Sequence, residues 1–149
     1  MVQVCGKVFK TVLICFFILT GINGCKDDFT SVIPYEHVSM DFNKANYIEL
    51  NIPGGVVYFP NAGFGGVIVY RDQIDSSNPY LAFDATCTNE VSSTCRVVVT
   101  EGSGTAKCPC CGSVFILSGG YGSPAKGPAI EPLKQYTTNF TGGRIIDTN

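Results

Sequence analysis

Short runs of β-branched and aromatic residues recur along the chain from about residue 45 to its end. Segments rich in Gly, Pro, Asn and Asp separate these runs, with a turn signal about every ten residues. No window after residue 25 keeps the 3.6-residue period of an amphipathic helix. The pattern therefore predicts an all-β fold, an antiparallel sandwich or barrel, built on one domain. The expected strands are residues 47–50, 56–59, 66–71, 80–83, 96–100, 114–117, 133–136 and 144–147.

Two of the separating segments carry specific turn chemistry. Residues 52–55 (Ile-Pro-Gly-Gly) predict a turn between the first two strands. Residues 141–143 (Thr-Gly-Gly) predict a tight hairpin before the last strand. Residues 26–44 are polar and irregular, and we interpret them as a tether.

The N-terminal hydrophobic pattern differs from the rest of the chain. Residues 1–10 carry two lysines and no acid, and the apolar run over residues 11–20 is only ten residues long. A helix needs roughly 20 residues to cross a bilayer, so a basic start and a short apolar run indicate a secretory signal. The sequence Ile22-Asn23-Gly24-Cys25 resembles the bacterial lipobox, in which the cysteine receives lipid after cleavage.

This resemblance implies a signal peptide over residues 1–24, a lipidated Cys25 with a tether over residues 25–44, and a domain over residues 45–149. The membrane is then a partner through the lipid anchor. Lys26-Asp27-Asp28 resembles the signal that sends some Bacteroidetes lipoproteins to the cell surface, although a solvated linker has the same composition. We expect an exported protein anchored in the bacterial outer membrane, on either its surface or its periplasmic face.

The charge balance excludes one class of function. The formal net charge is -2 for 149 residues, and removal of residues 1–24 takes away two lysines and no acid. A mildly acidic domain lacks the basic patch that binding to nucleic acid requires. No nucleophile-and-base motif, zinc-protease motif or P-loop occurs, so the sequence offers no catalytic constellation.

Cysteine is the residue type that points to chemistry. Five of the 8 cysteines fall between residues 87 and 111, in two segments rich in Gly, Ser, Thr and Pro. Two thiol-bearing loops at one end of a β domain can hold a metal ion, an iron–sulfur cluster or disulfides. His37 is the single histidine and lies in the expected tether, which excludes a site needing two imidazoles.

The second cysteine segment resembles a known family. Residues 108–115 (Cys-Pro-Cys-Cys-Gly-Ser-Val-Phe) resemble the second box of Rieske iron–sulfur domains, and residues 127–133 (Gly-Pro-Ala-Ile-Glu-Pro-Leu) resemble the proline loop of that family. Residues 85–89 occupy the place of the first box. The resemblance implies a Rieske-like β fold with a two-loop cysteine subdomain over roughly residues 47–146, and a [2Fe–2S] cofactor.

The chain departs from the family at both histidine ligands. A Rieske cluster uses two cysteines on one iron and two histidines on the other. The resemblance places Cys87 and Cys108 at the cysteine positions, whereas Asn89 and Cys111 stand at the histidine positions. A centre with two cysteine and two histidine ligands is therefore excluded.

Four alternatives remain for the cysteines. The first is disulfides: the resemblance suggests a Cys95–Cys110 pair, with Cys87–Cys108 closing in the absence of iron and Cys111 left unpaired. The second is a [2Fe–2S] cluster on Cys87, Cys108, Cys111 and Cys95, and the third is zinc on the same four thiols. The fourth is thiol redox exchange at the adjacent Cys110 and Cys111.

Two functional hypotheses follow. In one, a disulfide-stabilised Rieske-like domain without the standard cluster has a binding or structural role. In the other, the chain is an electron-transfer protein with a cysteine-rich [2Fe–2S] centre and a redox partner protein. The resemblance also places Gly112, Ser113, Gly127 and Pro128 in the loops around the centre, where Ser113 would hydrogen-bond a cluster sulfur.

Overall fold

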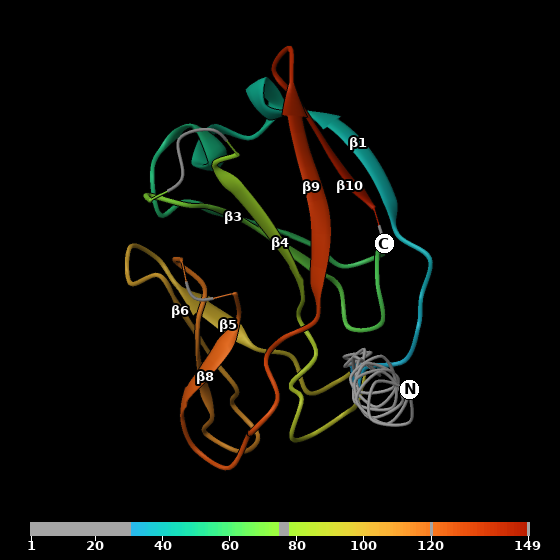
Figure 1. The fold of residues 1–149 in the computed structure, drawn as a ribbon, viewed down its shortest axis with the longest axis vertical. Helices are drawn as coiled ribbons and strands as arrows, with labels where there is room; N and C mark the ends of the chain where they lie inside the picture. The colour runs from blue at the N-terminus through green and yellow to red at the C-terminus, as the bar shows by residue number, and fades with distance from the viewer. Residues whose placement is uncertain (1–30, 75–77, 120, 149) are drawn as a thin grey trace, which may run out of the picture. The chain divides into compact units, whose positions relative to one another are not determined.

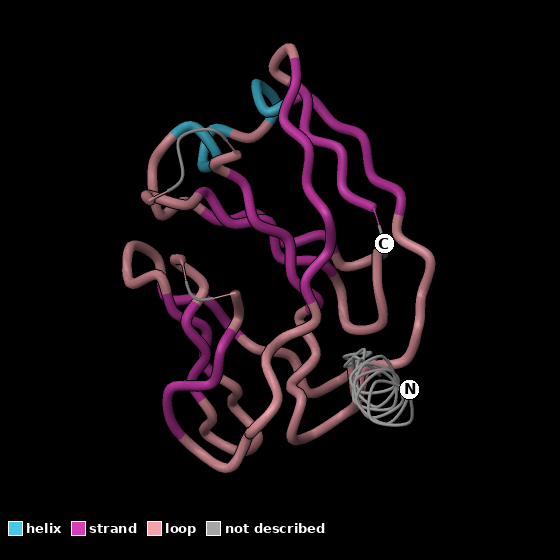
Figure 2. Tube along the Cα trace, in the orientation of Figure 1, coloured by secondary structure: helices cyan, strands magenta, loops and turns pink. Residues whose placement is uncertain are grey.

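Antiparallel β-strands make up nearly all of the regular structure. The structure is a computed structural model and describes residues 31–74, 78–119 and 121–148. These residues form ten strands and two short 3₁₀ helices (Figure 2). The expected all-β fold is confirmed. The predicted signal peptide and Cys25 lie outside the described residues.

The larger sheet has six strands in the order β1-β10-β9-β4-β3-β2 (Figure 1). Its strands β4 and β9 are paired neighbours, with Ala82 opposite Tyr136, although about fifty residues separate them in sequence. The strands are β1 Ser39–Asn43, β2 Val56–Phe59, β3 Val67–Arg71, β4 Tyr80–Asp84, β9 Gln135–Thr141 and β10 Arg144–Thr148.

The smaller sheet is inserted between β4 and β9. It has four strands in the order β5-β6-β7-β8, each paired with its neighbour in sequence. The strands are β5 Val98–Thr100, β6 Thr105–Lys107, β7 Val114–Ile116 and β8 Ser123–Lys126. The five cysteines of the domain lie in the loops of this insertion.

Strand β3 is buried on both faces, which explains its unbroken apolar run. Val67 and Val69 pack into one hydrophobic cluster of the larger sheet. Ile68 and Tyr70 point to the other face and join the cluster that contains the smaller sheet and Phe115. Successive strand residues alternate between faces, so one strand contributes to both cores.

One of the eight expected strands and part of the expected tether need correction. Residues 47–50 were expected to be a strand, but the 3₁₀ helices Lys44–Asn46 and Ile48–Asn51 occupy this region. The side chain of Asn43 accepts a hydrogen bond from the Ala45 backbone amide, which caps the first of these helices. Residues 39–43, assigned to the tether, instead form β1 and pair with β10.

Two strands of the smaller sheet were not expected. Strand β6 has one buried residue, Ala106, and β8 contains Pro124. Neither segment carries the apolar alternation on which strand prediction depends. The predicted hairpin is present: Gly142 and Gly143 join β9 to β10 with φ values of 60° and 83°. Positive φ at both turn residues favours glycine.

The described residues contain no helix with both the length and the apolar character to cross a bilayer.

Candidate functional site

Three loops build the cysteine centre. The first follows β4 and carries Cys87, and the second joins β6 to β7 and carries Cys108 and Cys111. The third is the proline loop after β8. Backbone hydrogen bonds fold the first two loops: Cys87 N donates to Cys95 O (3.2 Å), and Cys108 N donates to Ser113 O (2.8 Å).

The proline loop is bonded to both cysteine loops. The backbone amide of Ala129 donates to Ser113 Oγ (3.0 Å), and the hydroxyl of Thr88 donates to the Glu131 carbonyl (2.7 Å). Gly127, at φ +96°, lies so close to Ser113 that an added Cβ would come within 2.6 Å of its Cα. A side chain at position 127 would push the two loops apart, which explains the glycine. Pro128 beside it is exposed.

Three thiols meet at the centre. The sulfurs of Cys87, Cys108 and Cys111 all lie within 4.8 Å of one another, and those of Cys87 and Cys111 are 3.5 Å apart. Cys87 and Cys108 are fully buried, whereas Cys111 is half-buried. The structure thus brings together three of the four cysteines predicted as ligands.

The fourth predicted ligand, Cys95, is in a disulfide with Cys110, and the two Cα atoms are 6.2 Å apart. The other predicted bridge is not formed, because Cys87 and Cys108 are both free thiols. Each of these thiols also lies close to another cysteine: the sulfur of Cys108 is 3.5 Å from that of Cys95, and the sulfur of Cys87 is 3.5 Å from that of Cys111. Of the five cysteines in the part of the chain that the structure describes, three are therefore unpaired, where one was expected.

The arrangement does not fit two irons. Two thiolates on one tetrahedral ion with bonds of 2.3 Å are about 3.8 Å apart, and thiolates on different irons must be farther apart because the iron–iron distance is added. The resemblance would place Cys87 and Cys111 on different irons, yet their sulfurs are 3.5 Å apart. Asn89, at the other histidine position, is exposed, as is His37.

The three thiols have unequal acidity. Burial, and after it a hydrogen bond with Cys108, raise the pKa of Cys87 to about 12, against smaller opposing effects of nearby backbone amides. Burial also raises the pKa of Cys111, but hydrogen bonds with the side chain and backbone of Ser113 outweigh it and lower the pKa to about 7. The distance from Cys111 Sγ to Ser113 Oγ is 3.1 Å.

A buried aspartate that was not predicted from the sequence supports the first cysteine loop. Asp84, at the end of β4, is fully buried and accepts five hydrogen bonds. Its Oδ1 accepts from the backbone amide and hydroxyl of Thr86, next to Cys87. The Asp-x-Thr spacing at the end of a buried strand is the local signal for such a bond. The five donors to the Asp84 carboxylate are Phe64 N, Gly65 N, Thr86 N, Thr86 Oγ1 and Tyr136 OH.

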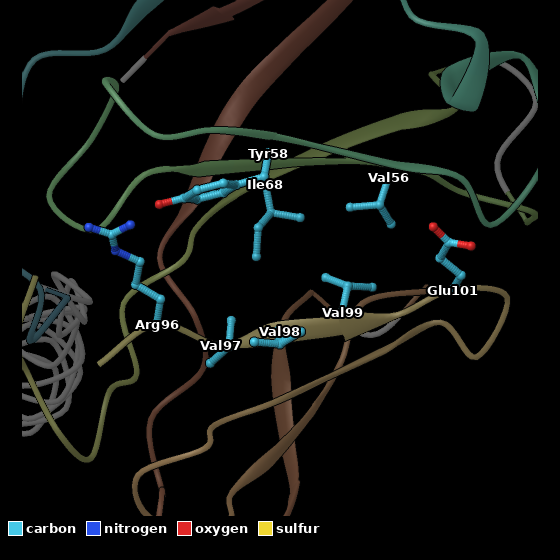
Figure 3. Close-up of a pocket in the computed structure, with 8 residues that line it drawn as sticks. All are labelled: Val56, Tyr58, Ile68, Arg96, Val97, Val98, Val99 and Glu101. Atoms are coloured by element: carbon cyan, nitrogen blue, oxygen red, sulfur yellow. The ribbon is translucent and has the colours of Figure 1, made fainter. Parts of the chain in front are cut away.

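A groove of about 340 Å³ lies between the two sheets (Figure 3). Aliphatic side chains form most of both walls, with Arg96 at one end and Glu101 at the other. The guanidinium of Arg96 lies 5.9 Å from the centre of the Tyr58 ring. The walls come from segments far apart in sequence, so the sequence pattern gave no sign of the groove. The wall residues are Val56, Tyr58, Ile68, Val97, Val98 and Val99.

An inserted four-stranded sheet, two cysteine loops and a covering proline loop define the class: the chain carries a Rieske-like domain. It is similar to the cyanobacterial plasma membrane Rieske protein PetC3 from Synechocystis PCC 6803, with 27% identity, a TM-score of 0.52, and coverage of 77% of this chain and 100% of that one.

Two further structures share the fold. The ferredoxin of carbazole 1,9a-dioxygenase from Nocardioides aromaticivorans IC177 is 19% identical, with a TM-score of 0.51 and coverage of 76% and 98% of the two chains. A chain in a complex of reduced oxygenase and oxidized ferredoxin in carbazole 1,9a-dioxygenase is 19% identical, with a TM-score of 0.53 and coverage of 76% and 94%. No family model and no curated protein matches the chain.

Proposed function

We propose that this chain is an exported, lipid-anchored protein whose Rieske-like domain is braced by a disulfide, does not carry the standard cluster, and serves a binding or structural role. The proposal rests on the residues at the two positions where the Rieske family has histidine ligands. One histidine position holds an exposed asparagine, Asn89, and the other holds Cys111, whose sulfur lies 3.5 Å from that of Cys87. That distance is too short for ligands of two different irons.

Export and anchoring are supported by the sequence. The lipobox-like Ile22-Asn23-Gly24-Cys25 follows a short apolar run, and several acyl chains on Cys25 would anchor the protein at about 0.8 kcal/mol per buried CH₂. The Cys95–Cys110 disulfide agrees with an oxidising compartment. The outer membrane, on its surface or periplasmic face, is the proposed location.

Iron content tests the proposal directly. The full-length chain, purified from membranes in detergent, is expected to be colourless and to contain no iron. Denatured without reductant, its domain is expected to show one disulfide and three titratable thiols, those of Cys87, Cys108 and Cys111. A brown protein with about two irons per chain would refute the proposal.

A brown protein that contains iron is the result expected from the second candidate function. An electron-transfer role with a cysteine-rich [2Fe–2S] centre is favoured by the convergence of three thiols within 4.8 Å at one point. Such a role would require a redox partner protein, and one of the structures with the same fold is a complex between a ferredoxin and an oxygenase. Loading a cluster would require Cys87 and Cys111 to separate.

Mass spectrometry tests the anchor. The N-terminal peptide of the protein made in a lipoprotein-processing bacterium is expected to begin at Cys25 and to carry acyl chains. The Cys25→Ser variant is expected to keep residues 1–24 and to gain no lipid. A wild-type N-terminal peptide that starts elsewhere, or that carries no lipid, would remove the anchor from the proposal.

A further inference from the structure

The three free thiols have the spacing of ligands to a single ion. Cys87, Cys108 and Cys111 have all their sulfurs within 4.8 Å of one another. Three thiolates on one tetrahedral zinc-type ion are about 3.8 Å apart, given bonds of 2.3 Å. The Cys87–Cys111 separation of 3.5 Å therefore needs to change by only a few tenths of an ångström. A separation that is too short for ligands of two irons is thus close to that of ligands on one ion.

The Cys95–Cys110 disulfide leaves Cys87, Cys108 and Cys111 as the available thiol ligands among the described residues. Cys95 and Cys110 are covalently paired, which removes the two remaining thiols of the domain from competition for an ion. The bond also joins the first cysteine loop to the second, so the loops that carry Cys87 and Cys111 are held together before any ion arrives. Preformed sites of this kind lose less conformational entropy on binding.

The surroundings of the thiols favour a bound cation. Cys87 and Cys108 have no exposed surface, and a buried thiolate is costly unless a positive charge compensates it. Ser113 is fully buried with its hydroxyl 3.1 Å from Cys111 Sγ, and the Ala129 amide fixes that hydroxyl. A hydrogen-bonding residue behind a ligand orients it, as the outer partners of metal ligands commonly do.

We propose that Cys87, Cys108 and Cys111 bind one divalent thiophilic cation of the zinc type. Cys108 and Cys111 supply the C-x₂-C pair common in zinc sites, and Cys87 supplies the third thiolate from the first loop. Three S–H bonds are exchanged for three metal–sulfur bonds, and the three protons pass to the solvent. Cys111 is the most exposed of the three, so the fourth coordination position lies toward its side and takes a water molecule.

Cobalt titration tests this site, because tetrahedral Co²⁺–thiolate sites absorb in the near ultraviolet and visible. The full-length chain in detergent, stripped of metal and kept free of external reductant, is titrated with Co²⁺ and then with Zn²⁺. We expect one Co²⁺ per chain, thiolate-to-cobalt charge-transfer bands, and displacement by one Zn²⁺. Chelator competition then gives the zinc affinity of each variant.

Three single substitutions distinguish a loss of metal ligation from a general loss of folding. Cys111→Ser is expected to weaken zinc binding by at least about 100-fold. Ser113→Ala keeps all three thiols and is expected to weaken binding about 10-fold through the lost orientation of Cys111. Asn89→Ser is the matched control at the other position that the resemblance assigns to a histidine ligand. Asn89 is exposed, and this variant is expected to bind zinc like the wild type.

Several outcomes would overturn the site. The first is a folded wild-type chain, judged by circular dichroism, that shows no charge-transfer bands. The second is a Cys111→Ser variant with unchanged affinity. The third is stoichiometric binding of Cu⁺ by a chain that retains neither Co²⁺ nor Zn²⁺. A colourless chain that binds no metal refutes this inference but not the proposed function, whereas two irons per chain would refute both.

Discussion

Replacement of Asp84 by asparagine tests the physical account of the first cysteine loop most sharply. The carboxylate is fully buried and faces five donors, three at Oδ1 and two at Oδ2. Asparagine keeps one acceptor oxygen and places an NH₂ group at the other position. If the remaining amide oxygen of the introduced asparagine takes the place of Oδ1 and accepts from Thr86, the NH₂ group takes the place of Oδ2. The backbone amide of Phe64 and the hydroxyl of Tyr136 then have no acceptor.

The magnitude follows from those two lost hydrogen bonds. A buried donor left without an acceptor costs about 1–3 kcal/mol, so Asp84→Asn is expected to lower the free energy of unfolding by about 2–6 kcal/mol. That loss is a large part of the 5–15 kcal/mol typical of a folded domain. Tyr136→Phe removes one donor and leaves the other four, and is expected to cost about 1–2 kcal/mol.

Urea unfolding measures these changes. The chain has no tryptophan, so far-ultraviolet circular dichroism and tyrosine fluorescence are the suitable signals. Asp41→Asn is the matched control, because Asp41 is half-exposed and pairs with Arg144 on the surface, where solvent screens the interaction. The reasoning would be refuted if Asp84→Asn cost no more than Asp41→Asn.

Three further predictions concern the disulfide, the proline loop and the buried tyrosine. Cys110→Ser opens a bridge that spans 15 residues and is expected to cost about 3 kcal/mol in urea unfolding; a loss below about 1 kcal/mol would contradict the loop-entropy argument. Gly127→Ala should cost about 1–3 kcal/mol more than Gly142→Ala, because both have positive φ but only position 127 adds a contact with Ser113; equal losses would count against that contact. Burial and Asp84 raise the pKa of Tyr136 above its ordinary value of about 10, so its contribution to stability is complete below pH 10 and falls above it by up to about 1.4 kcal/mol per pH unit. Unfolding curves between pH 9 and 11 should show this slope reduced in Tyr136→Phe, and an unchanged slope would argue against the raised pKa.

The sequence predicted the strands whose hydrophobic pattern is strong. Residues 66–71 and 80–83 are mostly apolar and mostly buried runs, and they form β3 (Val67–Arg71) and β4 (Tyr80–Asp84). Residues 47–50 have a similar local composition, but only Leu50 is buried. Tertiary burial, which a local pattern does not contain, decided between strand and 3₁₀ helix there.

The sulfur chemistry was predictable only in part. Loop spacing and family resemblance brought the five cysteines together, and the Cys95–Cys110 pair agrees with the disulfide suggested by the resemblance. The state of Cys87 and Cys108 depended on distances of a few ångströms between loops, which spacing in sequence does not determine. Asp84 was missed for the same reason, because its donors come from segments up to 52 residues away.

The insertion of the smaller sheet between two paired strands separates the cysteine loops from the pairing that holds the larger sheet. The pairing of strands β4 and β9 is made by residues outside the insertion, such as Ala82 with Tyr136. Asn89 and Cys111 lie outside every strand. Substitutions at these two positions can therefore accumulate without a change of architecture. Such substitutions change the donor atoms that the loops present, while the pairing of β4 with β9 is retained.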